Sequence, residues 1–129
     1  MEQTKELVNV IIEGDIHDIG KNIVKVLLQN YGFDVIDLGK DVKCERVVEE
    51  TLKNNVKFVG LSALMTTTVV NMEKTIKLLH EQTGAKVFVG GAVLTRDYAR
   101  QINADYYAKD AMESVRIAQE FFNKEDEEK

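Results

Sequence analysis

One short stretch of the sequence places a histidine between two aspartates and follows them with a glycine. Asp15, His17, Asp18 and Gly20 lie between an apolar run at residues 8–12 and an apolar stripe with helical spacing. The run predicts a buried strand and the stripe predicts a helix. In an open parallel sheet, ligands bind at the loops that leave the carboxyl ends of strands. A histidine in such a loop can coordinate a metal through one ring nitrogen while a carboxylate accepts the proton on the other.

Three later segments carry residue types that suit a ligand site. Residues 60–68 read Gly-Leu-Ser-Ala-Leu-Met-Thr-Thr-Thr and follow a short apolar run. Residues 90–92 read Gly-Gly-Ala after another such run, and two glycines allow a ligand to approach the backbone closely. Residues 107–111 read Tyr-Ala-Lys-Asp-Ala before the last helical stripe. Each segment alone is weak evidence, because turns and helix caps use the same residues.

The stretch Gly-Asp-Ile-His-Asp-Ile-Gly-Lys-Asn at residues 14–22 resembles the signature of cobalamin-binding domains. This form of the motif is the one seen in methionine synthase and in the corrinoid proteins of methanogens and acetogens. Residues 60–68, 90–92 and 107–111 resemble further segments of the same family in the same order, so that the resemblance covers nearly the whole chain. It implies cobalamin as the cofactor, as methylcobalamin or a related corrinoid, with cobalt as its metal.

The resemblance implies a base-off, His-on cofactor, in which the dimethylbenzimidazole tail is detached from cobalt. His17 would take the vacated axial position as the metal ligand. Asp15 would accept the proton on the other ring nitrogen of His17, and Thr68 falls where methionine synthase has the hydroxyl that completes the relay. These three residues are the catalytic set that the resemblance implies. A capping role for Thr68 is an equally good reading of its place before a helix.

The remaining implied residues surround the cofactor. Ser62 and Leu64 would line the slot for the nucleotide tail, Thr66 would lie near the corrin, and Tyr107 would pack on the nucleotide. Asp110 would cap the last helix beside it. The cofactor-binding residues implied by the resemblance are Asp15, His17, Asp18, Ile19, Gly20, Ser62, Leu64, Thr66, Thr68, Gly90, Gly91, Ala92, Tyr107 and Asp110.

Two reactive side chains have simpler explanations. His80 is expected at the exposed end of a helix, where it interacts favourably with the helix dipole. Cys44 is the only cysteine and has no cysteine or histidine at a spacing suited to zinc. We therefore expect neither residue in the site.

The order of elements predicts a flavodoxin-like α/β fold, with a doubly wound parallel sheet of five strands in the order 2-1-3-4-5 and helices on both faces. This order places the ends of the first and third strands at the switch point where ligands bind. The expected strands are residues 8–12, 33–38, 57–62, 86–89 and 105–108, with a turn at 39–41 after the second. The expected helices begin near residues 20, 44, 68, 95 and 111.

Length and composition are those of one globular domain. The chain has 129 residues, of which 44% are hydrophobic, and a net charge of −5 that argues against nucleic acid or an acidic membrane as the main partner. We expect residues 1–124 to form the cobalamin-binding domain and residues 125–129 to form an acidic, disordered tail. The first residues lack an apolar signal sequence and the lone cysteine suits a reducing compartment, so a cytoplasmic location is expected.

The residues of the motif at 14–22 favour a corrinoid protein that carries methyl groups in a cobalamin-dependent methyltransferase system. The chain alone would then be a cofactor carrier, and its partners would be the methyltransferase subunits that donate and accept the methyl group. A separate helical cap, a reactivase or a second copy of the chain are further candidate partners. Two other readings stay open: the small subunit of an adenosylcobalamin-dependent mutase, and a non-catalytic corrinoid sensor or storage module.

Overall fold

A computed structural model describes residues 6–12, 19–63, 68–91 and 94–127. Its five strands are β1 (Glu6–Ile12), β2 (Asp34–Val42), β3 (Phe58–Ser62), β4 (Lys86–Gly90) and β5 (Tyr106–Ala108). Its five helices are α1 (Ile19–Asn30), α2 (Cys44–Lys53), α3 (Val69–Gln82), α4 (Arg96–Gln101) and α5 (Ala111–Glu127). Strands and helices alternate along the described chain, as the sequence predicted.

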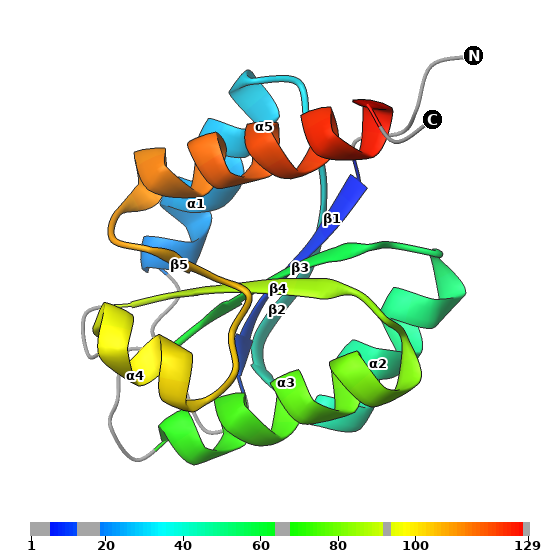
Figure 1. Ribbon diagram of the computed structural model, residues 1–129, viewed down its shortest axis with the longest axis vertical. Coiled ribbons are helices and arrows are strands. Elements are labelled where there is room, and N and C mark those ends of the chain that lie inside the picture. The colour runs from blue at the N-terminus through cyan, green and yellow to red at the C-terminus, as the bar shows by residue number, and fades with distance from the viewer. Residues whose placement is uncertain (1–5, 13–18, 64–67, 92–93, 128–129) are drawn as a thin grey trace.

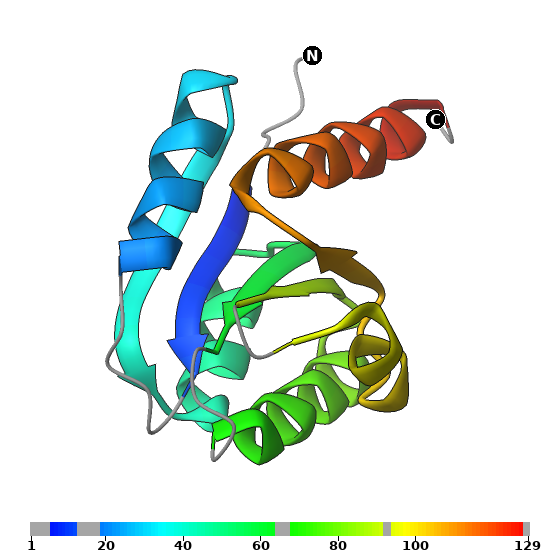
Figure 2. The ribbon, with the colours of Figure 1, turned by 90° about the vertical axis from the view of Figure 1, so that its left-hand side faces the viewer.

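The strands form one parallel sheet in the order β2-β1-β3-β4-β5, which confirms the predicted topology. Helices α1 and α5 cover one face of this sheet, and α2 and α3 cover the other (Figure 1). Turning the molecule shows α1 and α5 on the same side of the sheet, with α3 and α4 beyond the opposite side (Figure 2). None of the helices in the described ranges is long and apolar enough to cross a membrane.

Each face of the sheet has its own core. On the α2–α3 face, aliphatic side chains such as Met72, Ile76 and Leu79 are fully buried. On the α1–α5 face the core is aromatic, and Phe58 stacks on Phe121 with ring centroids 4.5 Å apart. Such an aromatic contact adds to the free energy gained by burying apolar area. The continuous apolar β3, whose first four residues are all buried, is typical of a strand covered on both faces.

Left-handed residues follow four of the helices. Gly32, Asn55, Gly84 and Asn103 have φ values of 90°, 53°, 68° and 64°, and follow α1, α2, α3 and α4. After α1, the amide of Phe33 donates to the carbonyl of Leu28 at 3.0 Å, which satisfies a carbonyl that the helix leaves unpaired. The predicted role of Gly32 as a left-handed cap is confirmed.

The turn expected at residues 39–41 is wrong, because β2 continues through it to Val42. The pairing of β1 with β2 shifts register after Asn9, and Val10 then lies opposite Gly39. The carboxylate of Asp37 accepts a hydrogen bond from the Gly39 amide at 2.8 Å, so the chain bends locally without leaving the sheet. Such bulges are common beside functional sites.

The boundary at the end of the chain also differs from expectation. Helix α5 continues to Glu127, three residues into the segment at 125–129 that we expected to be a disordered tail. The other helices begin within a residue or two of the expected positions.

Candidate functional site

A cavity of about 410 Å³ opens where β3, β4 and β5 end, beside α1 and the start of α5. It is lined by Lys21, Ile23, Val24, Ser62, Phe88, Gly90, Gly91, Leu94, Tyr107, Ala108, Lys109, Asp110, Ala111 and Ser114. Most of these residues present carbon to the cavity, with a few hydroxyl and charged groups among them. Such an apolar hollow with few polar groups is typical of a site for an organic ligand.

Five residues predicted from three separate segments meet in this cavity. Ser62 comes from the end of β3, Gly90 and Gly91 from the end of β4, and Tyr107 and Asp110 from β5 and the turn after it. They lie at the carboxyl edge of the sheet, where an open α/β fold binds its ligands. The structure therefore brings these residues together, although their contacts with a cofactor stay predictions.

Gly91 is required by a close approach of two loops. Its φ is +131°, and a β-carbon placed on it would lie 1.9 Å from the carbonyl oxygen of Ala63. The same two loops are joined by a hydrogen bond of 3.2 Å from the Ala63 amide to the Gly90 carbonyl. Only glycine permits a backbone contact this close.

Tyr107 and Asp110 are held by the protein itself. The hydroxyl of Tyr107 donates to the carbonyl of Leu94 at 3.1 Å, and the guanidinium of Arg96 lies 5.7 Å from the centre of its ring. Asp110 accepts a hydrogen bond from the amide of Glu113 at 2.8 Å. The predicted cap of the last helix by Asp110 is thereby confirmed, and the hydroxyl proton of Tyr107 is already used within the protein.

Thr68 occupies the N-cap position of α3 and is buried, but its side chain makes no capping hydrogen bond. The capping interpretation of this hydroxyl is therefore wrong, and the relay role stays a prediction. Thr95, in contrast, caps α4 as expected, since its hydroxyl accepts from the Tyr98 amide at 3.1 Å.

Several of the predicted site residues lie outside the described residues. They are Asp15, His17, Asp18, Leu64, Thr66 and Ala92. Ile19 and Gly20 are the first two residues of α1, so they do lie at the helix start that faces the carboxyl edge of the sheet. The axial ligand and its carboxylate partner accordingly stay predictions.

Lys21 was not assigned by the sequence, yet it is one of the most buried polar residues beside the cavity. Its side chain is 4% exposed, and its Nζ lies 2.5 Å from Oδ1 of Asp37 on β2. Lys25 approaches the other carboxylate oxygen at 3.3 Å. Burial opposes ionisation of Asp37, but hydrogen bonds from Lys21, the Gly39 amide and Lys25 outweigh it and lower the pKa of this carboxyl. The ion pair fixes the first turn of α1 to β2.

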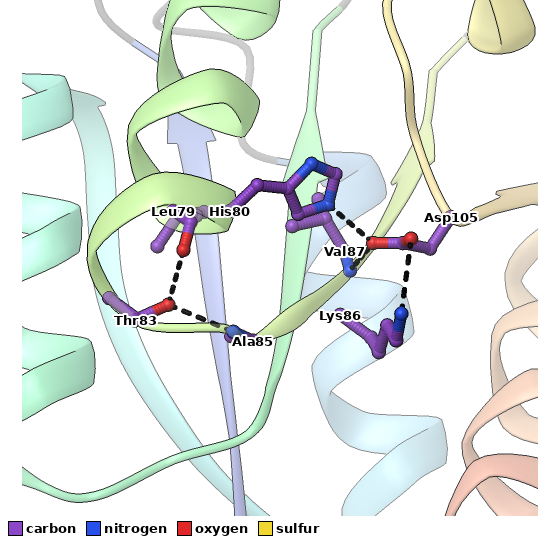
Figure 3. A network of polar contacts seen from close by, with 7 residues as sticks. All are labelled: Leu79, His80, Thr83, Ala85, Lys86, Val87 and Asp105. Atoms are coloured by element: carbon purple, nitrogen blue, oxygen red, sulfur yellow. Dashed lines mark hydrogen bonds and ion pairs between the residues drawn. The ribbon is translucent and has the colours of Figure 1, made fainter.

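His80 is not the free helix end that the sequence suggested. Its Nε2 lies 2.7 Å from Oδ2 of Asp105, which also accepts from the Val87 amide at 2.8 Å (Figure 3). Lys86 lies 3.9 Å from the other oxygen of Asp105. This polar network joins α3, β4 and the approach to β5 at the amino ends of the strands, opposite the cavity. The expectation that His80 stands outside the site agrees with that position.

Other lining residues were missed by the sequence analysis. Phe88 forms part of the wall because Gly60 has no side chain, and a β-carbon there would lie 2.3 Å from the Phe88 ring. Ser114 lines the cavity from the first turns of α5 and is 2% exposed. The sequence did carry a signal for Ser114, since it interrupts the apolar stripe of the last helix with a hydroxyl.

Comparison with known proteins identifies the protein family of this chain. Residues 6–116 match the family described as the B12 binding domain. The chain belongs to that family. It is 46% identical over 117 residues to dimethylamine corrinoid protein 2 of Methanosarcina mazei, a match that covers 88% of this chain and 55% of that protein. The cofactor that the sequence predicted, a cobalamin or related corrinoid, is the one that gives this B12 binding family its name.

Two solved structures resemble the chain closely. The monomethylamine corrinoid protein of Methanosarcina barkeri is 36% identical with a TM-score of 0.82, over 91% of this chain and 58% of that one. A chain of the methanol:cobalamin methyltransferase complex MtaBC from the same species is 35% identical with a TM-score of 0.84, over 94% of this chain and 48% of that one. The B12 binding domain described here thus spans about half the length of the relatives that it matches.

Proposed function

We propose that this domain carries a corrinoid in a cobalamin-dependent methyltransferase system. The observation that carries the proposal is the cavity at the carboxyl edge of the sheet, where Ser62, Gly90, Gly91 and Tyr107 meet as the family resemblance requires. The relatives named as methylamine corrinoid proteins and the methyltransferase complex support the same function. A corrinoid held by these residues would supply the cobalt chemistry of methyl transfer between two partner proteins.

The residues of the cavity fit the nucleotide tail of such a cofactor. The hollow of about 410 Å³ is in the range of sites for organic ligands, and its wall includes the aromatic Phe88 and the ring of Tyr107. Gly90 and Gly91 present no side chain at the strand ends that line the hollow, and Gly91 tolerates none because its backbone packs against Ala63. The tail would enter between these strand ends and lie beside α1 and α5, which keeps water away from it.

The loop before α1 would supply the axial ligand. We propose His17 as the residue that ligates cobalt and Asp15 as the carboxylate that accepts the proton on its other ring nitrogen. Lys21 and Asp37 hold the first turn of α1 against β2, which fixes the start of the helix that follows His17 in the chain. The partners would be the methyltransferase subunits that bring the methyl donor and acceptor to the exposed face of the corrin.

The axial ligand can be tested with hydroxocobalamin and protein labelled with nitrogen-15 in its histidines. Binding should be one to one, and reduction to Co(II) should give an electron paramagnetic resonance spectrum whose nitrogen splitting changes with the label. A splitting that ignores the label, as coordination by dimethylbenzimidazole would give, contradicts the His-on arrangement. The chain has two histidines. The label effect should disappear in His17→Ala and persist in the matched control His80→Gln.

A further inference from the structure

The sheet has an open edge at β5. This strand pairs with β4 along one side, and no strand in the described ranges pairs with its other side. Figures 1 and 2 show α4 and α5 on opposite sides of β5, so these two helices border the open edge. Between them lies a groove of about 260 Å³, which among the described residues shares only Tyr107 with the cavity at the carboxyl ends of the strands. Open strand edges readily associate with another chain, so this groove is a candidate interaction surface.

The two walls of the groove carry opposite charges. Arg96 and Arg100 line it from α4, whereas Glu113 and Glu120 line it from α5. Spacings of four residues on α4 and seven residues on α5 place each like-charged pair on one side of its helix. Ile117 lines the groove between the two glutamates. Apolar contacts surrounded by charged and polar groups are typical of the interfaces between proteins.

Arg100 and Glu120 are the charges most available to an external partner. Arg100 is exposed, and its guanidinium has no ion pair or hydrogen bond within the part of the chain that the structure describes. Glu120 lies 3.5 Å from Lys124 of its own helix, and both side chains are about 60% exposed. Glu113 is engaged more closely, since its Oε2 lies 2.6 Å from the guanidinium of Arg116.

A second copy of the chain would satisfy both walls at once. A partner with one sign of charge would be attracted by one wall and repelled by the other. Because α4 and α5 lie on opposite faces of the sheet, a two-fold axis beside β5 and parallel to the strands places α4 of one copy next to α5 of the other (Figure 2). Each Arg100 then faces the Glu120 of the other copy. The same contact occurs twice, as in any isologous interface.

We infer that the domain associates with a second copy of itself through the surface formed by α4, β5 and α5, with Arg100 of each copy paired to Glu120 of the other. Ion pairs between exposed side chains are weak and are screened by salt, so the association should be reversible and tightest at low salt. An axis parallel to the strands leaves both cavities open at the same end of the dimer. The inference does not rest on the corrinoid, because neither Arg100 nor Glu120 lines the cavity.

Sedimentation equilibrium of the purified chain at several concentrations measures this association. The wild-type chain should dimerise at low salt, with a Kd that rises in about 1 M salt, where the Debye length is about 3 Å. Arg100→Glu and Glu120→Arg should each raise the Kd of the dimer about tenfold, because both copies of the contact become repulsive. An equimolar mixture of these two variants should form mixed dimers with the wild-type affinity, since opposite charges then meet at both contacts.

Arg46→Glu and Glu49→Arg are the matched controls, because they make the same changes of charge at exposed positions of α2, which packs against β1 and β2. They should leave the Kd of the dimer unchanged, and circular dichroism checks that every variant is folded. A wild-type chain that stays monomeric at all concentrations overturns the inference, and the charges beside β5 would then protect the edge from association. A dimer that persists in Arg100→Glu, a mixture that recovers no affinity, or controls that weaken the dimer equally would also overturn it.

Discussion

A buried lysine and a carboxylate with a lowered pKa lie side by side at the start of α1. Because Asp37 has a pKa below its ordinary value of 3.8, it stabilises the folded state at pH values above that value. This contribution is lost as the pH falls through the lowered pKa. We expect Asp37→Asn to lower the free energy of unfolding by about 1–3 kcal/mol at neutral pH, with the difference shrinking in acid.

Urea denaturation of both proteins at neutral pH and in acid measures this difference. A deficit in Asp37→Asn of the same size at both pH values would show that the charge of Asp37 contributes nothing. Asp34→Asn at the exposed start of β2 is the control, and it should change stability little at either pH.

Gly91 offers a second prediction at a single position. Gly91→Ala places a β-carbon against the Ala63 carbonyl and forces an unfavourable φ, and the strained backbone alone costs about 1–3 kcal/mol. Gly39→Ala has a φ of +90° but nothing within 4 Å of the added carbon, so it isolates the backbone strain. We expect Gly91→Ala to be the less stable in urea denaturation and to lose corrinoid affinity. Equal stability of the two variants would mean that the loops adjust freely.

At the scale of elements, the network around Asp105 joins α3 to β4 and to the start of β5. Asp105→Ala should leave the Val87 amide without its acceptor and lower the free energy of unfolding by about 1–3 kcal/mol. Because the network lies at the amino ends of the strands, corrinoid affinity should not change. Urea denaturation and a cobalamin titration of the same protein separate the two effects, with Asp97→Ala on the exposed face of α4 as the control. A fall in corrinoid affinity together with the fall in stability would contradict the view that the network at the amino ends of the strands is independent of the cavity at their carboxyl ends.

The elements themselves were largely predictable from the sequence. Apolar runs such as 57–62 mark buried parallel strands, and left-handed caps such as Gly32 mark helix ends, because both depend on local chain physics. The continuation of β2 through Gly39 was not predictable in this way. A Gly-Lys-Asp segment has the local features of a turn, and only its pairing with β1 keeps it in the sheet.

The residues of the candidate site also fall into those that the local sequence indicated and those that it did not. The motif residues Ser62, Gly90 and Tyr107 were found from their order in the chain, and they meet in one cavity. Lys21, His80 and Ser114 were misjudged or missed, because their roles depend on residues or walls that are distant in the sequence. His80 and Asp105, for example, are separated by 25 positions. No local sequence pattern indicates such a distant partner.

For the whole molecule, cofactor binding and folding should be linked. A ligand that binds only the folded state at about one hundred times its Kd stabilises that state by about 2.7 kcal/mol. For a domain of this size we expect hydroxocobalamin to raise the Tm by about 10 °C. Cobinamide, which lacks the nucleotide, should raise it less at the same concentration, because the cavity between α1 and α5 remains empty. Equal shifts from both ligands would indicate that the tail lies elsewhere.

The cavity beside α1 and α5 lowers the stability of the free domain but is needed for cofactor binding. Ala108 and Ala111 are small residues in its lining, and larger apolar side chains there would fill space and strengthen the free domain. The same substitutions would exclude the nucleotide tail. Selection for corrinoid binding must therefore keep removing mutations that selection for stability alone would favour. In related domains that no longer bind the cofactor, we expect larger residues to appear first at these two positions. The size of the side chains aligned with Ala108 and Ala111 would therefore indicate whether a related chain still binds a corrinoid.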